Sequence, residues 1–182
     1  MSITTFVEKI KKPEIINSKD IKYIGIFFDK NSVLDTAENR QHLDKIIADP
    51  HITLAFNASK EQLEKLINFL NNHQTSDITA TITRYGNDGK NEGFYVENIS
   101  CSNGDTIPYF GAEQKHITIS ISKDSSAVKT GFMNFDEPIE PVTISGKIGL
   151  FMNDRSICFK PVEIEQENQN RGLRDDVGDD AR

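Results

Sequence analysis

Apolar and polar residues alternate along two short runs of the chain, and both runs begin with the same tripeptide, His-Ile-Thr. The apolar positions are Ile52, Leu54 and Phe56 in the first run and Ile117, Ile119 and Ile121 in the second. A period of two is typical of a strand with one buried face. Each run therefore predicts a strand whose polar face carries a histidine and, two residues later, a threonine.

Three further segments of the first half have patterns that predict regular structure. Residues 23–28 are continuously apolar, which indicates a central strand buried on both faces. Residues 32–47 fit a helix that ends before an Asp-Pro dipeptide. Residues 60–71 fit a second helix, for which Ser59 is a suitable N-cap and Gln62 completes a capping box.

The second half of the chain is rich in strand patterns and poor in helix patterns. Residues 78–100 predict a hairpin, with its turn at the Asn-Asp-Gly sequence of residues 87–89. Two further strands are expected at residues 142–145 and 147–152. Residues 123–131 are expected to form a polar loop after the second His-Ile-Thr strand.

The two ends of the chain differ from the rest. Residues 1–20 predict a short helix or an extended arm, and Pro13 would end any helix. Residues 166–182 contain almost no apolar side chains and predict a disordered polar tail. We therefore expect one domain over residues 1–165, which is large enough to bury a core without disulfides or metal.

Composition narrows the possible functions. The chain of 182 residues is 36% hydrophobic and 27% charged, which is ordinary for a soluble globular protein. No apolar run approaches the roughly 20 residues of a membrane span, and the start of the chain lacks a signal-peptide core. We therefore expect no membrane partner and a location in the cytoplasm of the producing or host cell. The net charge of −7 argues against a broad surface for duplex nucleic acid.

The candidate chemistry lies in the repeated tripeptide, which contains two of the four histidines. An imidazole titrates near pH 6.5, so a pair can act as acid and base together, and a threonine can donate a hydrogen bond to an anionic oxygen. A single His-Ile-Thr would more often be the polar face of an edge strand, but its repetition in matched strands favours a shared site. His42 and His73 lie outside the repeat. We expect His42 among polar residues of the first helix and His73 just beyond the second helix, as a charge near its C-terminus.

The two His-x-Thr strands, the first preceded by Asp49-Pro50, resemble the motifs of the 2H phosphoesterase superfamily. That superfamily includes RNA 2′,3′-cyclic phosphodiesterases, the phosphodiesterase domain of fungal and plant tRNA ligases, 2′,5′-oligoadenylate phosphodiesterases and viral anti-CBASS nucleases. The resemblance covers residues 23–159. It implies an α+β, bilobal fold in which two antiparallel sheets form a central groove, with helices outside. The helix-poor second half departs from the more evenly duplicated members.

The resemblance also implies an activity and its residues. His51, Thr53, His116 and Thr118 would catalyse hydrolysis of a phosphodiester without metal or other cofactor. The substrate would be a small nucleotide, a cyclic oligonucleotide or an RNA end. Which histidine is the acid and which is the base stays open at this point.

Substrate-binding residues are less well defined by the sequence. Tyr109 and Tyr23 offer aromatic faces for a base. The resemblance implies that the segment after the second motif contributes to substrate binding, which makes Lys129 a candidate contact to a phosphate or nucleotide. Each has a plainer interpretation, as a packed aromatic or a solvated lysine. Two other hypotheses also remain: a nucleotide-binding module without turnover, and a structural protein in which the repeat is a coincidence.

Overall fold

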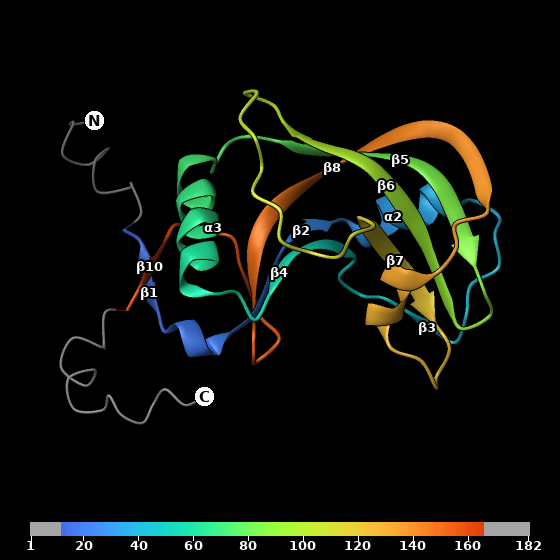
Figure 1. The fold of residues 1–182 in the computed structure, drawn as a ribbon, viewed down its shortest axis with the longest axis horizontal. Helices are drawn as coiled ribbons and strands as arrows, with labels where there is room; N and C mark the ends of the chain where they lie inside the picture. The colour runs from blue at the N-terminus through green and yellow to red at the C-terminus, as the bar shows by residue number, and fades with distance from the viewer. Residues whose placement is uncertain (1–11, 166–182) are drawn as a thin grey trace, which may run out of the picture.

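The structure is a computed structural model that describes residues 12–165 (Figure 1). Two α-helices, two 3₁₀ helices and ten strands make up this part of the chain. The helices are α2 (Lys30–Ala37), α3 (Lys60–Asn72), η1 (Ser18–Asp20) and η2 (Ala127–Phe132). The strands are β1 (Glu14–Ile16), β2 (Ile21–Phe28), β3 (Lys45–Ile46), β4 (His51–Phe56), β5 (Ile78–Asn87), β6 (Asn91–Cys101), β7 (His116–Ile121), β8 (Glu137–Met152), β9 (Ile157–Cys158) and β10 (Val162–Ile164).

Most strands belong to one antiparallel sheet with the order β3-β7-β6-β5-β8-β2-β4, to which β9 is added beside β8. The short strands β1 and β10 form a second, parallel sheet. The expected α+β class is confirmed, and the structure has few helices, one large antiparallel sheet and a second, small sheet. The strands of the two expected lobes are joined edge to edge, because β8 pairs with β2 from the first lobe and with β5 from the second.

The two predicted His-Ile-Thr strands are β4 and β7, and each begins at its histidine. They lie near opposite ends of the strand order. The sheet is strongly bent, with β8 arching across the molecule in orange in Figure 1. As a result, Cα atoms of β4 and β7 come within 8 Å of one another although the two strands are not paired.

Helix α3 agrees with its sequence prediction to within one residue. The Ser59 hydroxyl accepts a hydrogen bond from Gln62 N, and the Gln62 side chain accepts one from Ser59 N, so the capping box is formed. The apolar stripe of α3 lies in the same buried core as the apolar side chains on one face of the large sheet. The Asn71 side chain makes two hydrogen bonds of 2.8 Å with the main chain of Val162, which ties α3 to β10.

The helix predicted over residues 32–47 is wrong in its second half. Helix α2 ends at Ala37, and Glu38 takes a positive φ of 53° that stops further helical turns. Residues 45–46 instead form β3 and pair with β7. Leu43 N donates to the Ser120 hydroxyl at 2.8 Å. Hydrogen bonds to a distant strand, which no local pattern records, decide the conformation here.

The two strands predicted at residues 142–145 and 147–152 form one longer strand, β8. Gly146, which separated them in the prediction, pairs with Phe28 on one side and Ile78 on the other. Pro138 and Pro141 also lie in β8, where the strand has β5 as its only neighbour and the register shifts. An edge or a bulge is where a strand tolerates proline.

The hairpin predicted over residues 78–100 is confirmed as β5 and β6, with Gly89 at a φ of +86° in its turn. Within residues 12–165, no helix is long and apolar enough to cross a membrane. The predicted tail, residues 166–182, and most of the predicted N-terminal arm lie outside the described residues.

Candidate active site

His51 is the first residue of β4, and its ring is held by the turn before the strand. Nδ1 lies 2.9 Å from the carbonyl oxygen of Asp49. The Tyr23 hydroxyl lies 3.3 Å from the same nitrogen, and the two rings stack with their centroids 4.6 Å apart. Because a carbonyl oxygen can only accept, Nδ1 must carry the hydrogen. The Asp-Pro lead-in noted in the sequence therefore orients the ring and leaves Nε2 for a substrate.

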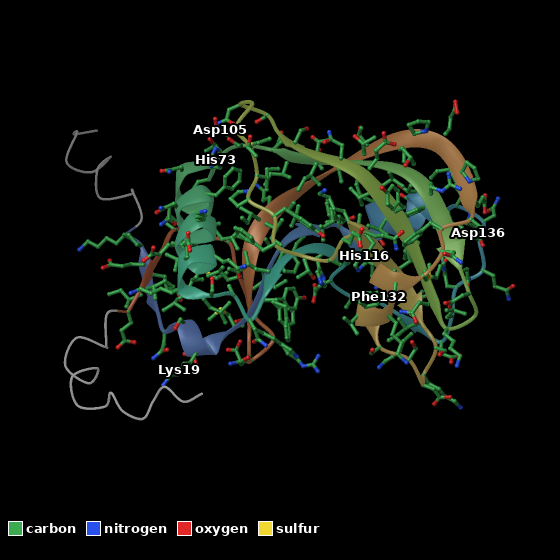
Figure 2. All side chains as sticks on the ribbon, in the orientation of Figure 1. Lys19, His73, Asp105, His116, Phe132 and Asp136 are labelled. Atoms are coloured by element: carbon green, nitrogen blue, oxygen red, sulfur yellow. The ribbon has the colours of Figure 1, made fainter. Side chains whose placement is uncertain are left out.

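His116 is the first residue of β7 and is held in the same way. Its Nδ1 lies 2.8 Å from the carbonyl oxygen of Gln114, again the residue two positions earlier. The Gln114 side chain donates to the carbonyl oxygens of Gly131 (2.9 Å) and Met133 (3.1 Å). Figure 2 shows His116 in the middle of the molecule, with Phe132 on the neighbouring η2 segment.

The threonines of the two motifs also have equivalent surroundings. Thr53 is the register partner of Gly25 in β2, and Thr118 is the register partner of Gly93 in β6. The register shifts beside each of these glycines, as at a β-bulge. A Cβ at Gly25 would lie 2.8 Å from the carbonyl oxygen of Ile52, and one at Gly93 would lie 2.7 Å from that of Ile117. Each motif strand therefore packs closely against its neighbouring strand at a glycine, where a side chain would not fit.

The segment before the second motif lies against the first motif. Phe110 N donates to the carbonyl oxygen of Leu54 at 2.7 Å. A Cβ at Gly111 would lie 2.3 Å from the carbonyl oxygen of Thr53, so the backbones touch there. The polypeptide that leads into His116 therefore runs along β4, and the two motifs are coupled through it.

Both histidines are electrostatically tuned toward the neutral form. Burial lowers the pKa of His51 below its ordinary value of 6.5, and the nearby His116 imidazole lowers the pKa further. Burial likewise lowers the pKa of His116. The hydrogen bonds to the carbonyls of Asp49 and Gln114 act in the opposite direction but are the smaller effects. Without substrate, both rings are therefore neutral at pH 7.

Thr118 is held by a buried chain of polar groups. Its hydroxyl lies 2.9 Å from that of Thr130, which also accepts from the Asn91 side-chain amide at 2.9 Å. Thr130 is fully buried on η2, where the sequence predicted only a polar loop. Thr53 is half-buried on β4. The buried link orients Thr118 before any ligand arrives.

The predicted substrate-binding residues are placed differently from one another. Tyr23 stacks on His51, as described above. The Tyr109 hydroxyl donates to the carbonyl oxygen of Ala112, burial raises the Tyr109 pKa to about 12, and Lys115 Nζ lies 4.6 Å from the ring centroid. Tyr109 thus packs within the segment that runs along β4. Lys129 is exposed on η2.

A buried cluster around Glu92 was missed by sequence reasoning. Glu92 is 0% exposed and accepts hydrogen bonds from the hydroxyls of Tyr85 and Ser120, each at 2.6 Å. His42 Nδ1 lies 2.9 Å from the same carboxylate. The prediction of His42 on a helix is therefore wrong, since it lies in the loop between α2 and β3. The members of this cluster lie far apart in the sequence, so no local sequence pattern indicated that they would meet.

His73 makes contacts of a structural kind. Its Nδ1 lies 2.8 Å from the carbonyl oxygen of Phe69, and its Nε2 lies 2.8 Å from Asp105 Oδ2. The pair is labelled at the end of α3 in Figure 2, on a different part of the molecule from His116. The predicted position at the C-terminus of the helix is confirmed, because His73 is the C-cap of α3.

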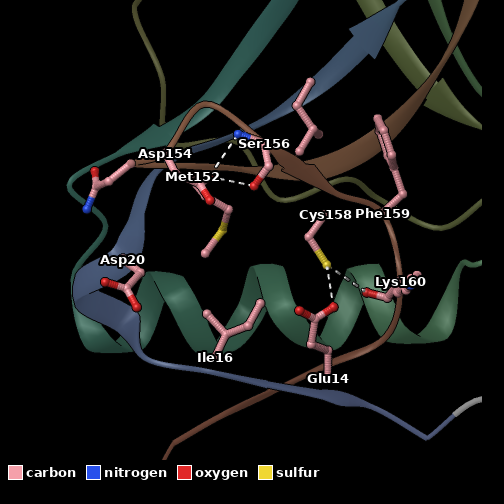
Figure 3. A pocket seen from close by; sticks show the side chains of 11 residues that line it. Glu14, Ile16, Asp20, Met152, Asp154, Ser156, Cys158, Phe159 and Lys160 are labelled. Carbon is pink, nitrogen blue, oxygen red and sulfur yellow. Dashed lines mark hydrogen bonds between the residues drawn. The ribbon is translucent and has the colours of Figure 1, made fainter.

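A cavity of about 610 Å³ lies beside β9, and neither motif histidine lines it (Figure 3). Cys158 within it lies 3.7 Å from Glu14 Oε1, and burial raises the Cys158 pKa. Throughout the part of the chain that the structure describes, no three His, Cys, Asp or Glu side chains gather as a metal ion would require.

A search of solved structures finds similarity to the crystal structure of a fungal RNA kinase, with 22% sequence identity and a TM-score of 0.45. The similar region covers 64% of this chain and 35% of the kinase chain, so this chain spans about a third of that protein. No family model matches the chain. A search of curated proteins also finds no match.

Proposed function

We propose that this chain is a phosphodiesterase that hydrolyses a cyclic phosphate, or a phosphodiester of a cyclic oligonucleotide, by two-histidine acid–base catalysis without a metal ion. His51 and His116 are the acid and base, and Thr53 and Thr118 donate hydrogen bonds to the phosphate. The observation that carries the proposal is the duplicated geometry. Each histidine is fixed by the carbonyl two residues earlier, and each threonine is opposite a bulged glycine.

The reaction follows from the state of the two rings. One neutral imidazole accepts a proton at Nε2 from water as the water oxygen bonds to phosphorus. The other ring must first be protonated, and an arriving phosphate anion favours this because opposite charge raises an imidazole pKa. That ring then gives its proton to the ribose oxygen as the P–O bond breaks. Each proton transfer contributes about 10²- to 10⁴-fold to the rate.

The threonines act on the charge that develops on the nonbridging oxygens. A hydroxyl that is already oriented stabilises this charge without rearranging during the reaction. In the free structure the Thr118 hydroxyl donates to Thr130, so its oxygen is held in place and its hydrogen turns from Thr130 to the phosphate when a substrate binds.

The decisive experiment is a hydrolysis assay in EDTA with a panel of 2′,3′-cyclic mononucleotides and cyclic di- and trinucleotides. The proposal expects turnover of at least one substrate. His51→Ala and His116→Ala should each reduce the rate by about 10²-fold or more. His73→Ala is a matched control that removes an imidazole from a distant contact. Full activity of either motif variant would refute the assigned roles.

The same panel separates the remaining candidates. Preference for cyclic oligonucleotides would fit a viral enzyme that degrades immune signals, whereas preference for 2′,3′-cyclic ends would fit RNA end repair. Tight nucleotide binding without product would identify a binding module. If the protein neither binds nor hydrolyses any of these nucleotides, the repeat is a structural feature without a catalytic role.

A further inference from the structure

A row of three side chains crosses the sheet from the first motif. His51 in β4 is the register partner of Phe27 in β2, and Phe27 is the register partner of Lys147 in β8. Partners in neighbouring antiparallel strands project from the same face, with Cβ atoms about 5 Å apart. Lys147 therefore lies two strands from His51 on the same face of the sheet, within reach of a ligand that contacts both.

Lys147 is held on this face by the burial of its neighbours. Ile148 and Leu150 are buried in the core on one side of β8, so the alternating positions, including Lys147, project from the other side. Lys147 is exposed. It makes no ion pair with any side chain of residues 12–165. Its charge is thus available to an anion.

The same face carries an aromatic cluster next to Lys147. Phe151 stacks on Tyr23 with ring centroids 4.7 Å apart and an interplanar angle of 8°. Phe159 meets Phe27 edge to face at 5.9 Å and covers the position of Gly149, where a Cβ would lie 2.8 Å from its ring. Phe159 remains 39% exposed, which leaves aromatic surface for stacking.

The second motif has the matching row, but its cation is already used. His116 is the partner of Tyr95, and Tyr95 is the partner of Arg84. The Arg84 guanidinium donates to the carbonyl oxygens of Phe135 at 2.7 Å and Asp136 at 3.4 Å. The two rows therefore differ. Arg84 in the His116 row is bound to main-chain carbonyl oxygens, whereas Lys147 in the His51 row makes no such hydrogen bond to the described part of the chain.

From these observations, and resting on the proposed function, we infer that the substrate extends from His51 across β2 and β8. A second phosphate binds Lys147, and the base attached to it stacks on Phe159. The substrate class is then an oligonucleotide with at least two phosphates, because a cyclic mononucleotide has only the phosphate held by the histidines. Neither residue touches the reacting phosphate, so both determine specificity and do not catalyse.

The test compares a 2′,3′-cyclic mononucleotide with a dinucleotide that ends in a 2′,3′-cyclic phosphate. Lys147→Ala should raise KM for the dinucleotide about tenfold, the lower limit for a hydrogen bond to a charged group. The kcat of Lys147→Ala for the dinucleotide, and both its kcat and its KM for the mononucleotide, should stay within about twofold of the wild-type values. Lys147→Arg should restore most of the dinucleotide KM. Phe159→Ala should raise the same KM, and Phe159→Tyr should not.

Lys22→Ala is the matched control, because Lys22 is also an exposed strand lysine but lines the cavity between β2 and α3. If Lys147→Ala affects both substrates equally, or neither, the inference is overturned while the proposed function stands. If no substrate is hydrolysed, binding of a dinucleotide 3′-phosphate measured by calorimetry replaces KM. Weaker binding by Lys147→Ala than by Lys22→Ala would support the inference. Equal binding by the two variants, or no binding by the wild type, would overturn it.

Discussion

Nδ1 of His51 lies 2.9 Å from the carbonyl oxygen of Asp49, which fixes the proton on Nδ1 and leaves Nε2 as the basic nitrogen. His116 has the same relationship to Gln114. Two rings with the same tautomer and the same free nitrogen can exchange roles. In the proposed reaction, the direction in which a substrate lies would then decide which ring is the acid.

The first prediction concerns the pH dependence of catalysis. In the free protein, burial lowers both histidine pKa values below 6.5, and the proposed reaction needs one ring protonated and the other neutral. The value of kcat/KM should therefore be highest below about pH 6.5 and fall as pH rises above that value. Bound phosphate raises the pKa of the acid, so the optimum of kcat should lie at higher pH.

This prediction is checked by pH–rate profiles at low and at saturating substrate. Profiles in which kcat/KM peaks above pH 7 would contradict the pKa directions. Profiles with the same optimum for kcat and kcat/KM would contradict the effect of bound phosphate on the acid.

The second prediction concerns stability and follows from the same pKa shifts. A histidine whose pKa is lower in the folded state binds protons more readily when unfolded, between the folded pKa and about 6.5. The free energy of unfolding should therefore decrease as pH falls below 6.5. The double substitution His51→Gln, His116→Gln should flatten this dependence. Urea unfolding of both proteins at pH 5 to 8 would measure it, and identical slopes would argue against buried neutral rings.

Much of this site was predictable from the sequence because its motifs are local. The alternation around Ile52 and Ile117 gave both strands, each with its first residue. The capping box gave α3. Glu92 and Thr130 were missed because buried polar residues look like solvated ones until their partners are known. The extended loop at Leu43 was missed because its hydrogen-bond partner, Ser120, lies 77 positions away.

The third prediction concerns the paired glycines. Gly25→Ala and Gly93→Ala would each place a methyl group under 3 Å from a carbonyl oxygen of a motif strand. The strand must move, so we expect each change to destabilise the fold by about 1–3 kcal/mol and to lower activity by displacing the histidine. Gly104→Asn is the control for activity, because its φ of +88° strains any side chain but a Cβ there would meet nothing within 4 Å, far from both motif strands.

Thermal unfolding and hydrolysis rates of the three glycine variants provide the measurement. If Gly93→Ala were as active as Gly104→Asn, close packing against β7 would not matter for the site.

The fourth prediction concerns the carboxylate behind the second motif. Glu92 is fully buried and accepts from Tyr85 and Ser120, and the Ser120 hydroxyl also accepts from Leu43 N. Tyr85→Phe removes one donor and leaves the buried carboxylate less satisfied, so the free energy of unfolding should fall by about 1–3 kcal/mol. Tyr95→Phe is the control, because Tyr95 is a partly exposed strand tyrosine.

The cluster also links the loop after α2 to β7, so its loss should reach the site. Ile47 N donates to the carbonyl oxygen of Ile119 at 2.9 Å, and Ser120 follows Thr118 by two residues on the same strand. In Tyr85→Phe, hydrogen exchange at Leu43 and Ile47 should accelerate, while exchange at Leu66 in α3 should change only by the loss of global stability. Equal acceleration at all three amides would mean that the cluster stabilises the whole domain and does not hold the loop against the motif strand.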